Sequence, residues 1–448
     1  MKPSLLVLAL AAVVSISTAQ PPVQQPYPTP LAVDLTRSIM KSVFESNAVP
    51  FVQPMVTTIN ATSNARFFTM AYVPAKVDKP YFRVSINAMA GLISEEQKWF
   101  DPTLDLGPRE NLGTALTTYG RIEGGTYKIG PRYDDTLGLA TVFMRELLRD
   151  ALAAGYFGIP DRAASLFGYL PDNRVVLPTK QNLETVLRQR PEYVALSISG
   201  QAAFLDSLIS RLTLPTSLTL PPGANMSSLT AAVPQLEIGS LYGTELLVRL
   251  IPPVRFDENV GDFSFWGVGL KHSISQYFPE RWFDMAVQGV YQGTTLTNTI
   301  GVTDSKLEAH ASMRSLSVQI GKRLWDAIDI YGAYAYEHID VTSTYTYVIP
   351  HETQVQLGLL PLDPPGGKSQ PTADRPGDTK PQTSQVLAED INHKLIFGVS
   401  ANYGPVRAAL DVNIGNFNIV SFALAYTFNQ PDQHDDPAAT PLRPAQAR

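Results

Sequence analysis

The sequence predicts an all-β dominated fold, an antiparallel transmembrane β-barrel of about 10–12 strands with a partly helical insertion and an N-terminal amphipathic helix. Three consecutive segments between His393 and Phe428 alternate apolar and polar residues, and turn residues separate them. Each is about 9–11 residues long, the length that crosses a bilayer at barrel tilt. Beyond the first residues, no apolar run is long enough to span as a helix. A membrane-embedded chain must then be a closed barrel, since only helices and barrels satisfy their backbone polar groups in lipid.

Residues 1–19 have the pattern of a cleavable signal peptide. Lys2 precedes an apolar core from Leu5 to Ile16, and small residues follow at Ser17-Thr18-Ala19. The core is shorter than the roughly 20 residues that a spanning helix needs. We therefore expect export to the bacterial outer membrane, with outer-membrane lipid and the barrel-assembly machinery as partners.

Composition excludes several classes of function. The chain has no cysteine, which excludes disulfides, thiol catalysis and lipid attachment at an N-terminal cysteine. It has 35 basic and 41 acidic residues without a basic stripe, which argues against a nucleic-acid partner. Its six histidines form neither a close pair nor an H-E-x-x-H motif, so we expect no metal site and no cofactor.

The N-terminal part predicts a helix followed by a hairpin. Residues 20–50 are a Pro/Gln-rich lead-in and an amphipathic helix, which either packs on a core or plugs the periplasmic mouth of the barrel. Its apolar residues at helical spacing are Leu31, Leu35, Ile39, Val43 and Phe44. Residues 51–93 are expected to form the first barrel hairpin, with strands at Arg66–Val73 and Tyr81–Leu92.

The barrel pattern then lapses over residues 94–234. This insertion carries helical signals at 137–156, 181–189 and 202–212, and it is too long for a simple connection. Three interpretations remain open: a periplasmic cap, a plug in the lumen, or a segment that holds two further strands.

Residues 235–428 are expected to supply the remaining barrel strands. If Phe428 ends at the periplasm, the connections on that side are short, and those on the other side are mostly long, as in outer-membrane barrels. The short ones lie at 278–280, 324–327 and 403–405; the opposite ones lie at 252–261, 293–306, 350–391 and 415–418. The segment 350–391 is expected to be a flexible external loop, and residues 429–448 a disordered polar tail.

The alternation assigns side chains to the two faces of the wall. An Arg or Lys side chain that faces lipid at mid-depth costs roughly 2–4 kcal/mol, so charges on the polar face of each strand should face the lumen. There they either line a water path or pair with one another. The lumen-lining candidates are Glu237, Glu245, Arg249, Lys271, Asp284, Arg407 and Asp411, and the lipid-facing candidates are Trp266, Val268, Leu270, Leu410, Val412, Phe422, Leu424 and Tyr426.

No motif indicates catalysis, and we expect the protein not to be an enzyme. A hydrolase site would need Ser273 or Ser275 near His310 or His338 across strands, and the chain has no G-x-S-x-G elbow.

Two segments carry a resemblance. The runs Gly-Thr-Glu-Leu-Leu-Val-Arg-Leu-Ile-Pro-Pro (Gly243–Pro253) and Gly-Val-Gly-Leu-Lys-His-Ser-Ile-Ser-Gln-Tyr-Phe-Pro (Gly267–Pro279) resemble an uncharacterised outer-membrane barrel family of Bacteroidota-type bacteria. The resemblance covers residues 51–99 and 234–428 and implies fold and location, without an activity. In length and N-terminal helix the chain is also similar in outline to the long-chain fatty-acid transporter barrels, but it lacks their Asn-Pro-Ala segment near the N-terminus.

The expected function is a passive channel or transporter for small or hydrophobic solutes. The alternatives are a closed structural or partner-binding barrel, a membrane-embedded hydrolase, and a secreted β-sandwich in which the apolar face of the strands from Val406 to Phe428 packs on a second sheet.

Overall fold

The computed structural model describes residues 27–75, 77–109, 120–123, 126–129, 138–194, 198–210, 212–257, 261–278, 281–300, 305–324 and 327–431. The signal peptide expected over residues 1–19 and most of the tail expected over 429–448 lie outside the described residues.

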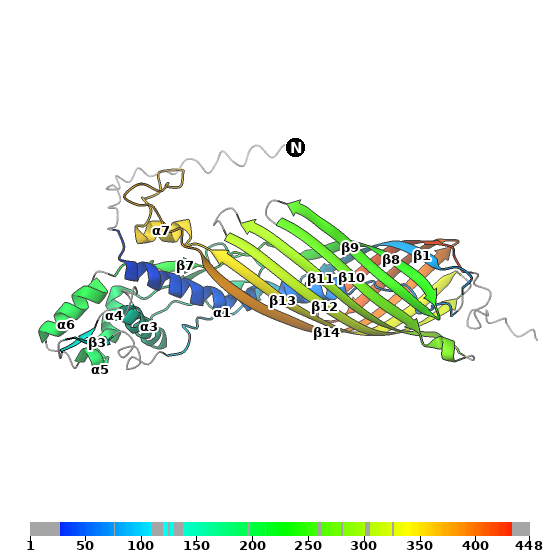
Figure 1. Cartoon of the computed structure of the whole chain (residues 1–448), viewed down its shortest axis with the longest axis horizontal. Coiled ribbons are helices and arrows are strands. Elements are labelled where there is room, and N and C mark those ends of the chain that lie inside the picture. Colours follow the sequence, from blue (N-terminus) through cyan, green and yellow to red (C-terminus); the bar gives the residue numbers. More distant parts are fainter. Residues whose placement is uncertain are drawn as a thin grey trace, which may run out of the picture.

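Ten strands close into one antiparallel barrel, which confirms the predicted fold class (Figure 1). Consecutive strands from β8 to β16 pair as neighbours, and β1 closes the wall by pairing with both β16 and β8. The β-sandwich interpretation is therefore wrong, because the apolar face of the last strands meets no second sheet. The strands are β1 (Tyr81–Leu92), β8 (Ser228–Leu241), β9 (Thr244–Asp257), β10 (Gly261–Ser273), β11 (Asp284–Ile300), β12 (Ser305–Leu324), β13 (Ile328–Tyr347), β14 (Gln382–Tyr403), β15 (Val406–Ile414) and β16 (Ile419–Phe428).

The alternation of side chains fixes which face of each strand looks inward. In β16, Phe422 and Leu424 are exposed on the outside, whereas Ser421 and Ala423 are buried inside. A shift of one residue would exchange the two faces, so the pattern also fixes the register, in which Phe82 lies opposite Phe428.

The strands differ greatly in length. β15 and β16 have 9 and 10 residues, which suffices to cross a bilayer, whereas β13 and β14 have 20 and 22. On the outer face of β13, Tyr334 and Tyr336 give way to His338 and Asp340. The long strands therefore extend beyond the apolar belt, and they do so toward the helical end of the molecule (Figure 1).

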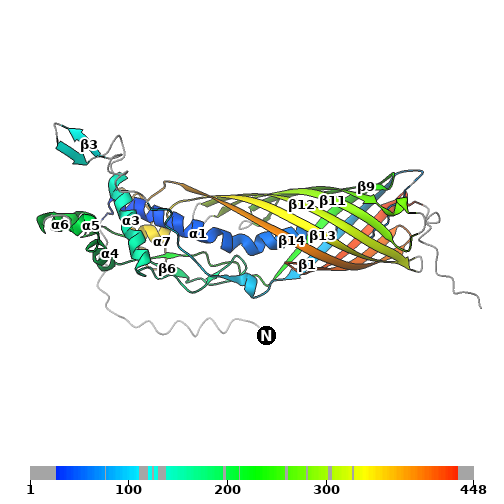
Figure 2. The ribbon, with the colours of Figure 1, turned by 90° about the horizontal axis from the view of Figure 1, so that it is seen from below.

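The helical end is a cap built from residues 93–227 and the beginning of the N-terminal helix α1 (Pro30–Ser63) (Figures 1 and 2). Its apolar core joins Leu35 and Ile39 of α1 to Leu147 and Leu148 of α3 (Gly138–Ala153) and to Leu187 of α4 (Lys180–Leu187). The remaining cap elements are η1 (Glu96–Lys98), β2 (Trp99–Phe100), β3 (Gly120–Glu123), β4 (Thr126–Ile129), β5 (Ala163–Ala164), β6 (Arg174–Val176), α5 (Pro191–Val194), α6 (Ile198–Leu205), the π-helical turn η2 (Asp206–Ser210) and β7 (Ser217–Thr219).

The helix α1 is much longer than expected. Thr29 caps its start, where its hydroxyl accepts from the Ala32 amide at 3.3 Å, and Pro30 occupies the first turn. The apolar spacing predicted a helix within residues 20–50, and α1 continues past this bound although Pro50 and Pro54 each remove a backbone hydrogen bond. The helix continues because its first half packs in the cap and its second half lies inside the barrel (Figure 2).

The hairpin expected over residues 51–93 is wrong. Residues 51–63 complete α1, residues 64–80 include no strand among those described, and only β1 belongs to the wall. The segment Arg66–Val73, expected as the first strand of this hairpin, runs instead through the lumen, where side chains of the wall take the place of a partner strand.

The insertion supplies no strand to the wall before β8, which begins at Ser228 and not at the expected residue 235. It is also not the main plug. Most of its described residues lie beyond the barrel, and before β8 Phe167 and Met226 pack in the apolar cluster around Val56, Met313 and Ile339.

Two expectations about the connections need correction. The segment expected as a loop over 350–391 contains α7 (His351–Leu357) and the beginning of β14, and it packs on α1 through an ion pair between Asp378 and Arg37. The expected long loops at 252–261 and 293–306 are mostly strand, because pairing in β9–β12 continues past the apolar belt. The two long connections, 93–227 and 348–381, still lie at the end opposite β16's last residue, Phe428; at Phe428's end the longest connection is 274–283, which includes η3 (Ser275–Tyr277).

Within the described residues, no helix has both the length and the apolar character needed to cross a membrane.

Candidate functional site

All seven predicted lumen-lining residues have buried side chains inside the barrel. The set comprises Glu237, Glu245, Arg249, Lys271, Asp284, Arg407 and Asp411, and none is more than 7% exposed. Their charges are paired, because each of these residues except Arg249 forms an ion pair. The partner of Arg249 is instead the backbone of a segment that fills the lumen.

This lumen segment comprises residues 53–80, the second half of α1 and the chain that follows it. It enters at the cap end and leaves at the end with the short turns, where β1 begins (Figures 1 and 2).

Near the cap end, the wall holds the lumen segment through Asp390 and Lys394 of β14. The Asp390 carboxylate accepts from Thr57 Oγ1 and from Asn60 Nδ2, both at 2.9 Å. The Lys394 ammonium pairs with Glu337 and donates to the Ala61 carbonyl at 3.2 Å. The end of α1 is thus fixed by buried charges as well as by apolar packing.

Midway along the lumen, Arg249 of β9 takes the role of a helix cap. Its guanidinium donates to the Ser63 carbonyl at 2.9 Å and the Ala65 carbonyl at 2.8 Å, and it lies 3.6 Å from the centre of the Phe67 ring. Carbonyls at the end of a helix lack intrahelical donors, so a buried cation there satisfies them.

Arg66 makes the reverse connection, from the lumen segment to the wall. It pairs with Asp411 of β15 and donates to Tyr331 Oη and the Ala409 carbonyl, both at 2.6 Å. Its backbone φ of 61° lies in the left-handed region, which costs a residue other than glycine roughly 1–3 kcal/mol. Its ion pair and hydrogen bonds offset this strain.

Between Arg66 and the barrel end with the short turns, two groups of charged side chains surround the last part of the lumen segment. In the first, Glu245 accepts from Arg83 at 3.2 Å and from Tyr81 at 2.9 Å, and it forms an ion pair with Lys271. Glu237 completes this group by pairing with Arg83.

In the second group, Asp329 of β13 accepts from Arg323 at 2.9 Å and lies 3.3 Å from Arg407. Arg407 also donates to Thr69 Oγ1 at 3.3 Å, which ties this group to the lumen segment.

Several residues of this network were not predicted from the sequence: Arg66, Arg83, Asp329, Glu337 and Lys394. Four of them lie on the polar phase of β1, β13 or β14, so the alternation that identified Glu237 could have identified them. Arg66 gave no such signal, because its segment is neither strand nor helix.

The eight predicted lipid-facing residues all lie on the outer face, between 42% and 57% exposed: Trp266, Val268, Leu270, Leu410, Val412, Phe422, Leu424 and Tyr426. Exposed aromatic residues follow at the rim with the short turns, among them Tyr242, Trp282 and Tyr403. An apolar belt bordered by aromatic residues is typical of a barrel in lipid.

The serines and histidines considered for a hydrolase are not brought together. Ser273 is buried in the lumen, whereas His338 lies on the outer phase of β13. On β11, Ala286 lies opposite Ser273 and Thr295 lies opposite His310. These two positions are nine residues apart, which separates Ser273 from His310 by roughly 30 Å along the strand direction. Ser275 donates instead to the Met285 carbonyl at 3.2 Å.

One group of possible metal ligands occurs among the described residues, although the sequence predicted none. The ligand atoms of His338, Asp340 and Glu389 lie within 4.8 Å of one another on the outer face. Arg314 already engages Asp340 at 3.5 Å, and Glu389 is exposed, so the group lacks the closed geometry of a structural metal site.

Fold and lumen together define a class: a closed ten-stranded barrel whose own N-terminal segment fills its interior. The chain belongs to the Family of unknown function (DUF6588), whose model matches residues 169–428. The match covers the barrel strands after β1 and begins within the insertion. No curated protein matches the chain in sequence.

Among solved structures, the attachment invasion locus protein Ail of Yersinia pestis is 10% identical, with 41% of this chain and 93% of that chain covered and a TM-score of 0.19. Pseudomonas aeruginosa OccK2 (OpdF) is 10% identical, with 46% of this chain and 72% of that chain covered and a TM-score of 0.11. A BenF-like porin from Pseudomonas fluorescens Pf-5 is 9% identical, with 46% of this chain and 69% of that chain covered and a TM-score of 0.12. TM-scores this low carry no inference about the present chain.

Proposed function

We propose that this protein is an outer-membrane β-barrel that is sealed by its own N-terminal segment and that anchors its cap as a structural or partner-binding domain. The observation that carries the proposal is the filled lumen. Backbone carbonyls of the lumen segment accept from wall residues at three levels, namely Lys394, Arg249 and Ser400.

The connectivity makes this seal permanent. One end of the lumen segment continues into the part of α1 that packs in the cap core, and the other end continues into β1 of the wall. To leave the lumen, the segment would have to pull α1 out of the cap or β1 out of the barrel. A plug fixed at both ends favours a closed barrel over a passive channel.

The location follows from the outer surface. The apolar belt spans the length of β15 and β16, and outer-membrane barrels place their short turns at the periplasm. By that rule the cap lies outside the cell, and the periplasmic cap considered from the sequence is the less favoured placement. An external domain meets partners rather than solutes of the periplasm.

The test is single-channel recording of purified, refolded protein in a planar bilayer. Folded protein, verified by its heat-dependent mobility in gels, is expected to give no discrete conductance steps. A variant that starts at residue 79 keeps only the last two residues of the lumen segment and is expected to conduct, whereas a variant without residues 111–137 of the insertion keeps the whole segment and should stay silent.

The channel alternative makes the opposite prediction for the intact chain. Discrete steps whose size changes when Lys271 or Arg249 is neutralised would show an open lumen lined by these charges, and the sealed-barrel proposal would then be wrong.

A further inference from the structure

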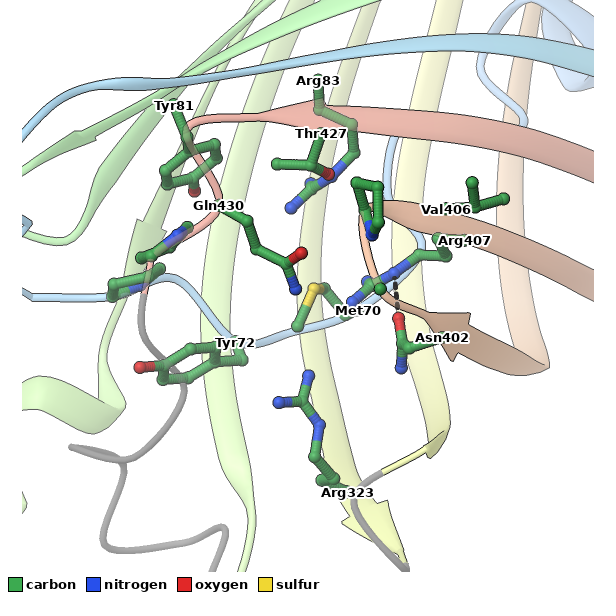
Figure 3. Close-up of a pocket in the computed structure, with 14 residues that line it drawn as sticks. Met70, Tyr72, Tyr81, Arg83, Arg323, Asn402, Val406, Arg407, Thr427 and Gln430 are labelled. Carbon is green, nitrogen blue, oxygen red and sulfur yellow. Dashed lines mark hydrogen bonds between the residues drawn. The ribbon is translucent and has the colours of Figure 1, made fainter.

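A small cavity opens at the end of the barrel with the short turns. Its volume is about 40 Å³, and its lining includes Met70, Arg83, Arg323, Asn402, Arg407 and Gln430 (Figure 3). A site of this volume can hold a few water-sized groups. We call it the arginine pocket.

Three guanidinium groups converge on the arginine pocket from different strands. Arg83 comes from β1, Arg323 from β12 and Arg407 from β15, and in Figure 3 all three point into the same space. Each side chain is only 8–9% exposed, so the charges lie in a largely desolvated site. Electrostatic attraction for an anion is much stronger there than at an open surface.

Among the residues that the structure describes, no acidic side chain lines the arginine pocket. The acids that balance its arginines, Glu237, Glu245 and Asp329, lie behind them in the wall and do not line the cavity. The lining adds the Thr427 hydroxyl and the Gln430 amide, whereas the Asn402 amide already donates to the Ala327 carbonyl and to Asp329. The cavity thus presents donors and positive charge on several sides.

Arg83 supplies an open donor. Its Nε donates to Thr427 at 3.2 Å and its Nη1 to Glu237 and Glu245, whereas Nη2 has no protein acceptor in the described part of the chain. Nη2 is not among the fully buried unsatisfied atoms, so it faces the cavity, as Figure 3 shows for this guanidinium.

We propose that the arginine pocket binds an oxyanion of the size of a phosphate group, either free or as part of a lipid headgroup. Guanidinium groups suit this chemistry, since their fixed N–H donors match two oxygens of one phosphate. The inference is independent of the sealed-barrel proposal, because the pocket lies at the mouth and needs no path through the lumen.

The experiment measures binding of inorganic phosphate to the full-length protein in detergent by calorimetry, with ionic strength held constant with sodium chloride. Wild-type protein is expected to show one saturable site. Gln430→Glu adds a carboxylate to the pocket without touching a buried ion pair, because Gln430 is exposed, and should weaken binding at least about tenfold.

Two matched variants serve as controls. Gln430→Ala removes the same side chain without adding charge, and Arg255→Gln removes an arginine that is exposed and lies far along the barrel, on β9. Both should bind phosphate within about twofold of wild type. Absence of a saturable site, or equal weakening in Gln430→Glu and Arg255→Gln, would overturn the proposal.

A second arm identifies the source of the phosphate group. Protein reconstituted in phosphatidylglycerol is compared with protein in a maltoside detergent, which contains no phosphate group, at the same phosphate concentrations. Weaker apparent phosphate binding in phosphatidylglycerol supports a lipid headgroup as the occupant, and equal binding supports a free oxyanion.

Discussion

Arg66 and Asp411 form an ion pair in the centre of the barrel, with side chains 0% and 2% exposed. Arg66 belongs to the lumen segment and Asp411 to the wall, and Asp411 also accepts from Asn413 at 2.7 Å and from Tyr331 at 3.1 Å. The pair therefore joins the two parts of the molecule where neither is reached by water. Buried pairs of this kind add little net stability, but removing one partner leaves an uncompensated charge.

The first prediction concerns this pair. Arg66→Met should lower the free energy of unfolding by about 3–5 kcal/mol, because Asp411 loses its cation while staying buried. Guanidinium-induced unfolding of the refolded protein measures the loss. In the double variant with Asp411→Asn the loss should be smaller than the sum of the two single losses, and strict additivity would refute a direct pairing.

A surface pair provides the control for this measurement. Arg314 and Asp340 are 63% and 46% exposed and lie 3.5 Å apart on the outer face. Arg314→Met should cost no more than about 1 kcal/mol, because water and salt screen exposed pairs.

The second prediction concerns the outer belt. Leu410→Arg should destabilise the barrel in lipid by roughly 2–4 kcal/mol, because its side chain faces outward in the middle of β15. Leu241→Arg, at the rim beside a short turn, should cost only about 0–1 kcal/mol. Folding titrations in vesicles provide the measurement, and equal costs at the two positions would contradict a lipid-facing belt.

The third prediction is a pH dependence outside the membrane. The pKa of the Asp363 carboxyl is lowered to about 2, first by the Ser369 amide, which donates at 2.8 Å, and then by His351, whose ring lies at 2.7 Å. Since the folded pKa is depressed, the contribution of this carboxylate to stability is present above its ordinary value of 3.8 and is lost as the pH falls through about 2.

A carboxyl-labelled NMR titration measures this pKa directly. Because the Ser369 amide is the larger cause, His351→Gln should leave the pKa of Asp363 below 3.8. Titration of wild-type Asp363 at its ordinary pKa would show that the loop does not hold this arrangement.

Alternation could predict the wall of the barrel because every wall residue obeys one local rule. Glu245 and Leu246 lie on opposite faces, and this difference is visible in the sequence itself. The ends of the strands were harder to predict from the sequence. β11 and β14 continue past the apolar belt, where the outward-facing residues are polar as well and the alternation is lost.

The lumen segment could not be predicted in this way. Its placement depends on contacts between residues far apart in the chain, such as Arg249 with Ser63, and no local pattern marks them. The apolar spacing that predicted the helix ended at Phe44, and the mostly apolar residues from Arg66 to Val73 were interpreted as a strand. Tertiary contacts overrode both local signals.

The last prediction tests on which side of the membrane the cap lies. The chain has no cysteine, so a single introduced cysteine is the only site for a maleimide reagent. Val194→Cys places it on α5 of the cap, where Val194 is 61% exposed, and Tyr403→Cys places it at a short turn, where Tyr403 is 88% exposed. With a membrane-impermeant maleimide on intact cells, the Val194→Cys variant should be labelled and the Tyr403→Cys variant should react only after the outer membrane is permeabilised. The opposite pattern would place the cap in the periplasm and reverse the orientation that the short turns indicate.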